Sequence, residues 1–136
     1  MEEQITSRER TIAWLLIGIA IVVNAAGYLF DLWATPVWYD EAVHGFTTLS
    51  ITLLIGLYLY DVVYRGADDH FLLLVLVIAS VGLAIGAVWE VFEWADDQFV
   101  TPGNSILGKW DTITDLVVDT LGALVGGAIA AFWARR

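Results

Sequence analysis

Residues 82–94 read Gly-Leu-Ala-Ile-Gly-Ala-Val-Trp-Glu-Val-Phe-Glu-Trp and close a long apolar run with two carboxylates. At helical spacing, Gly82 and Gly86 share one face of a helix. Glu90 and Glu93 continue that face toward the end of the run. This helix face has glycines within the apolar run and carboxylates near its end. Such a face predicts close helix packing around a polar site inside a membrane bundle.

A later apolar run repeats this arrangement in the opposite order. Asp115 and Asp119 come first, and Gly122 and Gly126 follow at helical spacing. If the two runs are antiparallel neighbours, their glycines pack at one level and their carboxylates meet at another. We therefore expect both helices to contribute to one acidic site.

The composition excludes several classes of protein. Of the 136 residues 59% are apolar, which is too many for a water-soluble domain of this size, and there is no Cys for disulfides or thiolate metal sites. Sixteen acidic residues against six basic ones give a net charge of −10. This balance argues against a nucleic-acid partner, which requires a basic face, and it suits a halophile.

Four apolar runs are long enough to cross a bilayer, since about 20 helical residues span the hydrocarbon core. We expect one membrane domain over residues 1–136, an all-α polytopic four-helix bundle, with spans at about 11–31, 36–64, 70–95 and 112–134. The alternative for the first run is a signal peptide, because Arg8 and Arg10 precede it and small residues follow at Ala25 and Ala26. Thr6 with Glu9 has the spacing of a capping box, and Asp111 is expected at the N-cap of the last helix.

The distribution of basic residues predicts the orientation. With the N-terminus cytoplasmic, the inner side carries Arg8, Arg10, Arg65, Arg135 and Arg136, and the outer side carries only Lys109. This is a clear positive-inside bias. We therefore expect a multi-pass protein of the cell (inner or plasma) membrane with both termini in the cytoplasm.

This orientation brings three helix ends to the outer side. The acidic and His side chains expected at that level are Asp40, Glu41, His44, Glu90, Glu93, Asp115 and Asp119. Two ionised carboxylates 4 Å apart repel by about 4 kcal/mol at an effective dielectric of 20. The cluster therefore needs a bound metal ion, shared protons, or both.

The spacings within this cluster suit a metal. Glu41 with His44 and Glu90 with Glu93 are i, i+3 pairs, and helical bundles hold di-metal sites with inward-facing pairs of this kind. The oxygen-rich set favours Mg, Ca or Mn, and one imidazole admits Zn or Fe. The alternative for Asp40 and Glu41 is a role in the first helical turn, where acids stabilise the helix dipole. Asn24 and Asp31 are candidates for a further polar wall.

The same residues carry a resemblance to the YjdF-type inner-membrane proteins, which are distant relatives of VanZ-like proteins. The matching motifs are Tyr39-Asp40-x-x-x-His44, Gly86-x-x-Trp89-Glu90-x-x-Glu93 and Asp111-Thr112-x-x-Asp115-x-x-x-Asp119-Thr120-x-Gly122. The resemblance covers roughly residues 38–127 and implies a multi-helix membrane protein with these acids and His44 at its site. It supplies no reaction, although the link of VanZ-like proteins to glycopeptide-antibiotic resistance suggests envelope chemistry.

Three functions remain open at this point. The first is a divalent-metal site open to the outside, in an enzyme that hydrolyses a lipid or envelope precursor with Glu93 or His44 as base. The second is cation or proton transport through a homo-oligomer formed by the glycine faces. The third is a structural or partner-binding membrane subunit, whose acids would face solvent and not one another. Against phosphate hydrolysis, only Lys109 lies near the site to hold a phosphate.

Overall fold

The computed structural model describes residues 6–30, 32, 37–60, 70–101 and 108–136, with no side-chain description for residue 37. These ranges form four helices, α1 (Ser7–Phe30), α2 (Val37–Leu59), α3 (Phe71–Phe99) and α4 (Lys109–Ala134), and contain no strand. Each helix is long and apolar enough to cross a membrane. The predicted fold class, an all-α multi-pass bundle in a lipid bilayer, is confirmed.

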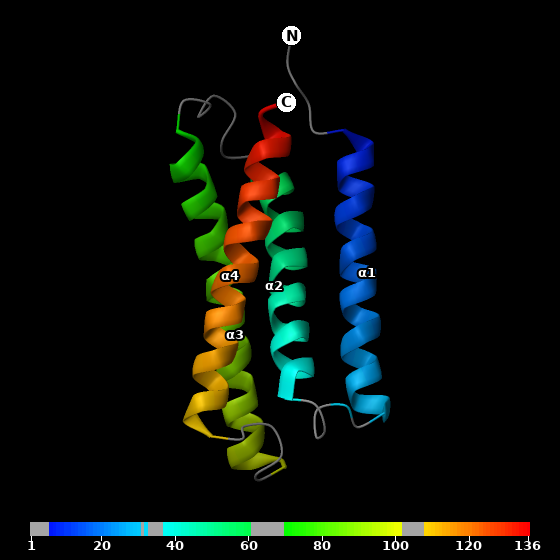
Figure 1. Ribbon diagram of the computed structural model, residues 1–136, viewed down its shortest axis with the longest axis vertical. Helices are drawn as coiled ribbons and strands as arrows, with labels where there is room; N and C mark the ends of the chain where they lie inside the picture. The colour runs from blue at the N-terminus through cyan, green and yellow to red at the C-terminus, as the bar shows by residue number, and fades with distance from the viewer. Residues whose placement is uncertain (1–5, 31, 33–36, 61–69, 102–107) are drawn as a thin grey trace.

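The helices run up and down, so that ends distant in the sequence meet in space. Both chain termini lie at one end of the bundle (Figure 1). The start of α2, the end of α3 and the start of α4 lie at the opposite end (Figure 1). This is the convergence on which the predicted acidic site depends.

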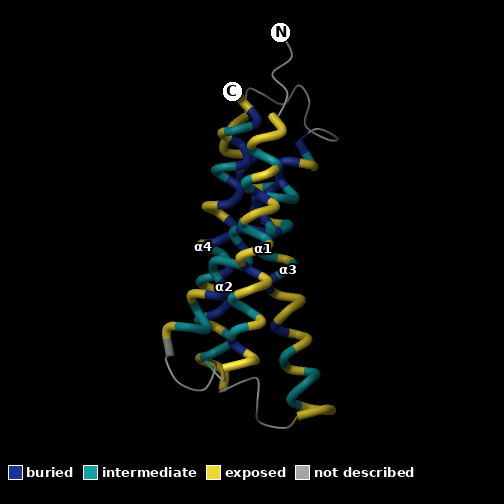
Figure 2. Tube along the Cα trace, turned by 90° about the vertical axis from the view of Figure 1, so that its right-hand side faces the viewer, coloured by how far each residue is buried: buried dark blue, intermediate teal, exposed yellow. Residues whose placement is uncertain are grey.

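Helix α1 is peripheral. The helices α2 and α4 share the largest interface, α3 packs mainly on α4, and α1 packs mainly on α2. Only Ala13, Ala20 and Gly27 of α1 are buried, at intervals of seven residues, and most of its other residues are exposed (Figure 2). A narrow stripe of small side chains is therefore the seam between α1 and the rest of the bundle.

The apolar core occupies the half of the bundle near the termini. It includes Leu53 and Leu57 of α2, Ile78 of α3 and Ala130 of α4, all with 1% exposure or less. The buried polar and charged residues are His44, Thr48, Ser50, Thr52, Glu90, Asp115 and Asp119. The apolar core therefore lies in one half of the bundle, and the buried charged residues lie in the other half.

The glycines of α4 allow a close approach of α2. A Cβ built on Gly122 would overlap the backbone carbonyl of Gly45, and one on Gly126 would lie 2.5 Å from the carbonyl oxygen of Leu49. On α3, a Cβ on Gly82 would overlap the side chain of Thr52. The expectation that α3 and α4 pack through their glycines is confirmed only in part. Gly86 faces Asp119 of α4 and Gly127 faces Val75 and Ala79 of α3, whereas Gly122 and Gly126 face the backbone of α2. These faces are filled within one chain, so an oligomer would need a different surface.

The helix ends differ from the predicted bounds by a few residues. At the start of α1, the backbone N–H of Thr6 donates to Glu9 Oε2 at 2.7 Å, as the capping spacing predicts. Helix α3 continues past residue 95 to Phe99. Helix α4 begins at Lys109 with Gly108 as its N-cap, so Asp111 lies in the first turn and its predicted N-cap role is wrong. Gly108 has φ 123°, a conformation that favours glycine.

Several predicted features lie outside the described residues. They are Asp31, the Thr35-Pro36 start of the second span, its end at residues 61–64, and the turn with Arg65 at residues 65–69.

Candidate metal centre

His44 lies at the centre of the acidic end of the bundle. It is on the second turn of α2 and has 7% exposure. Its Nε2 lies 3.6 Å from Asp40 Oδ1 and 4.0 Å from Glu93 Oε1. Its Nδ1 lies 3.6 Å from Asp119 Oδ1 and 3.7 Å from Glu90 Oε1. One imidazole therefore joins carboxylates from α2, α3 and α4.

Two sets of side chains within the described part of the chain have the spacing of metal ligands. One is Asp40, His44 and Asp115, and the other is His44, Glu90 and Glu93. In each set, one ligand atom per residue lies within 4.8 Å of the others. Because both sets share His44, they describe one region and not two separate sites. Mixed imidazole and carboxylate ligands fit a first-row divalent ion.

Glu90 is the most unusual member of this region. It has 6% exposure, and neither oxygen of its carboxylate makes a hydrogen bond of ordinary geometry within the described residues, although Thr112 of α4 approaches it. A buried carboxylate without donors is costly unless a positive charge or a proton compensates it. A cation or a proton at this position would compensate the buried charge.

Asp119 is buried still more completely. It has 1% exposure, and its Oδ1 accepts a hydrogen bond of 2.5 Å from Thr48 Oγ1. Its Oδ2 has no hydrogen-bond partner and lies beside Gly86, where a Cβ would overlap the carboxylate. Gly86 is therefore needed for the close approach of Asp119 to α3. Asp119 belongs to neither set of candidate ligands.

The open side of the region is formed by the partly exposed acids. The side chains of Asp40 and Glu93 have 28% and 22% exposure. Trp89 Nε1 donates a hydrogen bond of 2.9 Å to Glu93 Oε1. The Trp therefore orients the Glu that faces His44.

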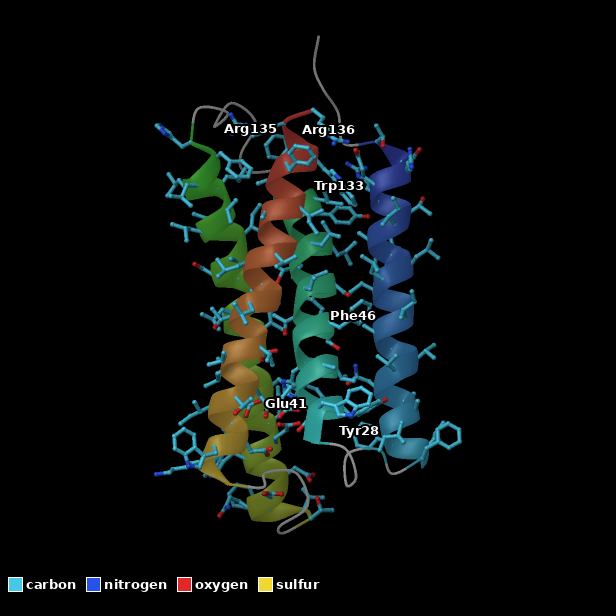
Figure 3. All side chains as sticks on the ribbon, in the orientation of Figure 1. Tyr28, Glu41, Phe46, Trp133, Arg135 and Arg136 are labelled. Atoms are coloured by element: carbon cyan, nitrogen blue, oxygen red, sulfur yellow. The ribbon has the colours of Figure 1, made fainter. Side chains whose placement is uncertain are left out.

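The structure thus brings together most of the predicted site residues. Five of the seven occur in the two sets, and Asp119 contacts His44 from the side. Glu41 lies at the same end of the bundle (Figure 3) but belongs to neither set, and its buried Oε2 has no hydrogen-bond partner. The predicted polar wall on α1 is present in Asn24, whose Nδ2 donates to Thr47 Oγ1 at 3.0 Å.

Two contributors are not among the predicted site residues. Trp89 donates to Glu93. Thr48 donates to Asp119, and its position four residues after His44 puts both on one helix face. That spacing was the signal that could have identified Thr48 as a partner of the site.

The comparisons with known proteins identify a family for the chain. Residues 4–136 match the family described as predicted membrane protein (DUF2238). The chain belongs to the DUF2238 family. The match covers almost the whole chain, beyond the residues 38–127 of the motif resemblance. Searches of curated proteins and of solved structures found no match for the chain. The chemistry of this DUF2238 member must therefore be inferred from its own side chains.

Proposed function

We propose that this DUF2238 protein binds a divalent metal ion through His44, with Glu90 and Glu93 from α3 and with Asp40 and Asp115 completing the site. The observation that carries the proposal is Glu90, a carboxylate with 6% exposure and two oxygens without hydrogen-bond partners, 3.7 Å from His44 Nδ1. A cation between these groups would compensate the buried negative charge. It would also hold together carboxylates from three helices, which repel one another without a cation.

The ligand types narrow the choice of ion. Both candidate sets contain His44 together with carboxylates. Mg²⁺, Ca²⁺ and Mn²⁺ prefer oxygen ligands, whereas imidazole suits Zn²⁺ and Fe²⁺. We therefore propose Zn²⁺ or Fe²⁺ ahead of Mn²⁺, Mg²⁺ and Ca²⁺.

The charges at the two ends support an outward-facing site. Arg8 and Arg10 lie near the chain terminus at the same end as Arg135 and Arg136 (Figure 1), whereas Lys109 starts α4 at the other end. Under the positive-inside rule, the end with His44 faces the extracytoplasmic side of the plasma membrane. This position, and the motif resemblance to YjdF-type and VanZ-like proteins, support a role at the cell envelope.

Hydrolysis of a lipid or envelope precursor is a further step that the geometry supports less well. Glu93 is held by Trp89 and partly exposed, as a general base requires. None of the residues that line the adjoining pocket is Lys or Arg, so a phosphate group has no side-chain cation there. We therefore propose ion binding. Hydrolysis of a lipid or envelope precursor stays a prediction.

Metal content measured on purified protein tests this proposal. Wild type should hold about one ion per chain, and His44→Ala and Glu90→Gln should lose it. Glu41→Gln is the matched control, because Glu41 lies three residues from His44 on α2 but in neither ligand set. An ion present at about 100 times its Kd should stabilise wild type by about 2.7 kcal/mol. A wild type without metal, whose Tm is the same with Zn²⁺, Mn²⁺ or chelator, would refute the proposal.

A further inference from the structure

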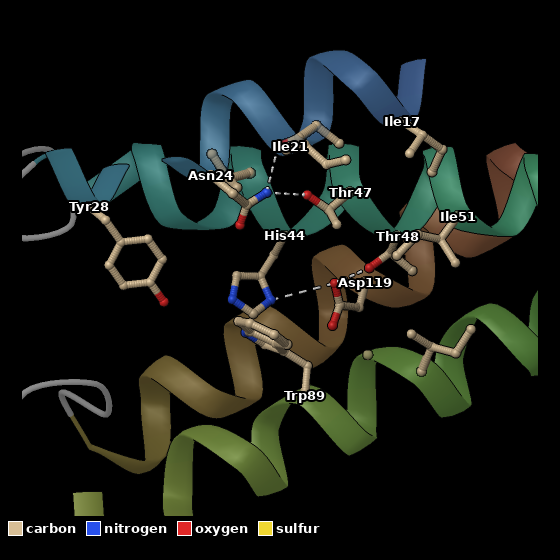
Figure 4. A pocket seen from close by; sticks show the side chains of 14 residues that line it. Ile17, Ile21, Asn24, Tyr28, His44, Thr47, Thr48, Ile51, Trp89 and Asp119 are labelled. Atoms are coloured by element: carbon tan, nitrogen blue, oxygen red, sulfur yellow. Dashed lines mark hydrogen bonds and ion pairs between the residues drawn. The ribbon is translucent and has the colours of Figure 1, made fainter. Parts of the chain in front are cut away.

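A cavity of about 350 Å³ lies beside the acidic region, between α1 and α3 and over one face of α2 (Figure 4). Its walls are largely aliphatic, with Ile17 and Ile21 from α1, Ile51 from α2 and Ile85 from α3. Ligand pockets in proteins measure about 300–1,000 Å³ and combine apolar walls with a few polar groups. This cavity is large enough for a small organic ligand.

The polar groups of the cavity include one carboxylate, that of Asp119, beside the imidazole of His44 and the neutral side chains of Asn24, Thr47 and Thr48. Asp119 lines it with 1% exposure and an Oδ2 that has no hydrogen-bond partner, and His44 lies beside Asp119 (Figure 4). None of the described lining residues is Lys or Arg. Even a protonated His44 supplies one positive charge against the four carboxylates that lie within 4.0 Å of its ring nitrogens. The acidic end of the cavity therefore repels an anionic ligand and favours a cation.

Two aromatic residues stand near the acidic end of the cavity. Trp89 of α3 and Tyr28 of α1 both line it, with 45% and 70% exposure (Figure 4). An ammonium group over an aromatic face gains about 0.5–2 kcal/mol, and more as water is excluded. Trp89 also donates to Glu93, which places a second carboxylate next to its ring.

The length of the cavity indicates an elongated ligand. The lining residues of α1 run from Ile17 to Tyr28, a distance of about 16 Å at about 1.5 Å per residue. This is about half of the ~30 Å hydrocarbon core, or one leaflet. A ligand with its charge at the acidic end would thus have an apolar wall along one leaflet for its chain.

We propose that this cavity binds a lipophilic organic cation, an ammonium group that carries an apolar chain. The charged head lies against Asp119 and the ring of Trp89, and the chain lies along the isoleucines of α1, α2 and α3. The site is separate from the metal site, because Asp119 belongs to neither set of metal ligands, although His44 borders both. Binding here is an additional function and does not require that a metal be bound.

The test of this site is the equilibrium binding of decyltrimethylammonium. It is measured on the full chain in zwitterionic lipid nanodiscs, and the signal of empty discs is subtracted. Decyldimethylamine oxide has the same chain without net charge at neutral pH and should bind at least tenfold more weakly. Asp119→Asn should weaken the ammonium at least tenfold and keep an acceptor for Thr48. Ile51→Trp should fill the cavity and abolish binding, whereas Val22→Trp, on α1 but outside the lining, should bind as wild type does.

Metal content measured on the same preparations separates the two proposals. Ile51→Trp should lose the ammonium and keep the metal. A wild type that binds decyltrimethylammonium but no metal would refute the metal site and leave this inference standing. Equal binding of the ammonium and the amine oxide would show that the charge of the ligand does not matter and would overturn it. Unchanged ammonium binding by Asp119→Asn or by Ile51→Trp would overturn it as well.

Discussion

At the scale of single residues, the arrangement around His44 follows from helical spacing on α2. Asp40, His44 and Thr48 are separated by four residues each, so they form one polar face that points at α3 and α4. Each ring nitrogen of His44 has two carboxylates within 4.0 Å. Substitutions on this face should therefore act through buried charges, which have larger effects than ordinary surface contacts.

The hydrogen bond from Thr48 should be one of the stronger ones in the bundle. Thr48→Val removes a buried donor to a carboxylate, which we expect to lower the free energy of unfolding by about 1.5–3 kcal/mol. Thr47→Val is the matched control, because Thr47 accepts only a neutral bond from Asn24, with an expected loss of about 0.6 kcal/mol. Thermal unfolding in detergent with chelator present measures both. An equal loss of unfolding free energy in Thr48→Val and Thr47→Val would show that the Asp119 carboxyl group is not charged in the folded protein.

Glu90 should destabilise the metal-free protein. In chelator, Glu90→Gln removes a buried charge without hydrogen-bond partners and should raise the free energy of unfolding by about 1–3 kcal/mol. In excess metal the order should reverse, because only wild type gains stability from the ion. Unfolding of both proteins under both conditions checks the reversal. A variant that is less stable than wild type in chelator would contradict this account of Glu90.

Much of this residue-scale arrangement could be predicted from the sequence. An ionisable residue within an apolar span must face the bundle interior, which identifies Glu90, Asp115 and His44 without a structure. The separate positions of Asp119 and Glu41 could not be predicted. Asp119 contacts His44 but lies outside the ligand sets, where Thr48 and the space at Gly86 hold it. Glu41 follows Asp40 directly in the first turn of α2, where spacing does not decide which of the two faces inward.

At the scale of helices, the close seam between α2 and α4 depends on missing side chains. Gly122→Ala would place a Cβ into the backbone carbonyl of Gly45, which cannot rotate away. We expect a loss of about 1–3 kcal/mol, typical of overpacking. Gly18→Ala is the control, because a Cβ there has nothing within 4 Å and should stabilise α1 by up to about 1 kcal/mol. Detergent unfolding measures both variants.

Changes of opposite sign in the free energy of unfolding of these two variants would support α2–α4 packing through Gly122. A Gly122→Ala protein as stable as wild type would contradict it. The sequence predicted that Gly122 lies at a helix contact, but it assigned this contact to α3 and not to α2. A small residue shows only that a neighbour comes close, and the identity of the neighbour depends on how all four helices pack.

At the scale of the whole molecule, orientation in the membrane decides which compartment supplies the ion. The native chain has no Cys, so Ser7→Cys and Gln98→Cys each introduce a single exposed thiol at opposite ends of the bundle. In intact cells, a membrane-impermeant maleimide should label Gln98→Cys and leave Ser7→Cys unlabelled until the cells are opened. The positive-inside distribution of Arg is the physical reason.

The reverse labelling pattern would place the acidic end in the cytoplasm. The metal site would then draw on cytoplasmic ions, and a role at the cell envelope would be excluded. Labelling of both variants in intact cells would show two orientations. Either result would leave the geometry around His44 unchanged.

The peripheral position of α1 has a consequence for how a ligand would be supplied. Because α1 packs mainly on α2, the cavity between α1 and α3 faces the bilayer along its side. A lipophilic molecule could reach it by lateral diffusion without returning to water. The occupancy of the cavity would then follow the concentration of the ligand in the lipid phase. Two ligands with identical protein contacts would therefore differ in apparent affinity by the ratio of their membrane partition coefficients.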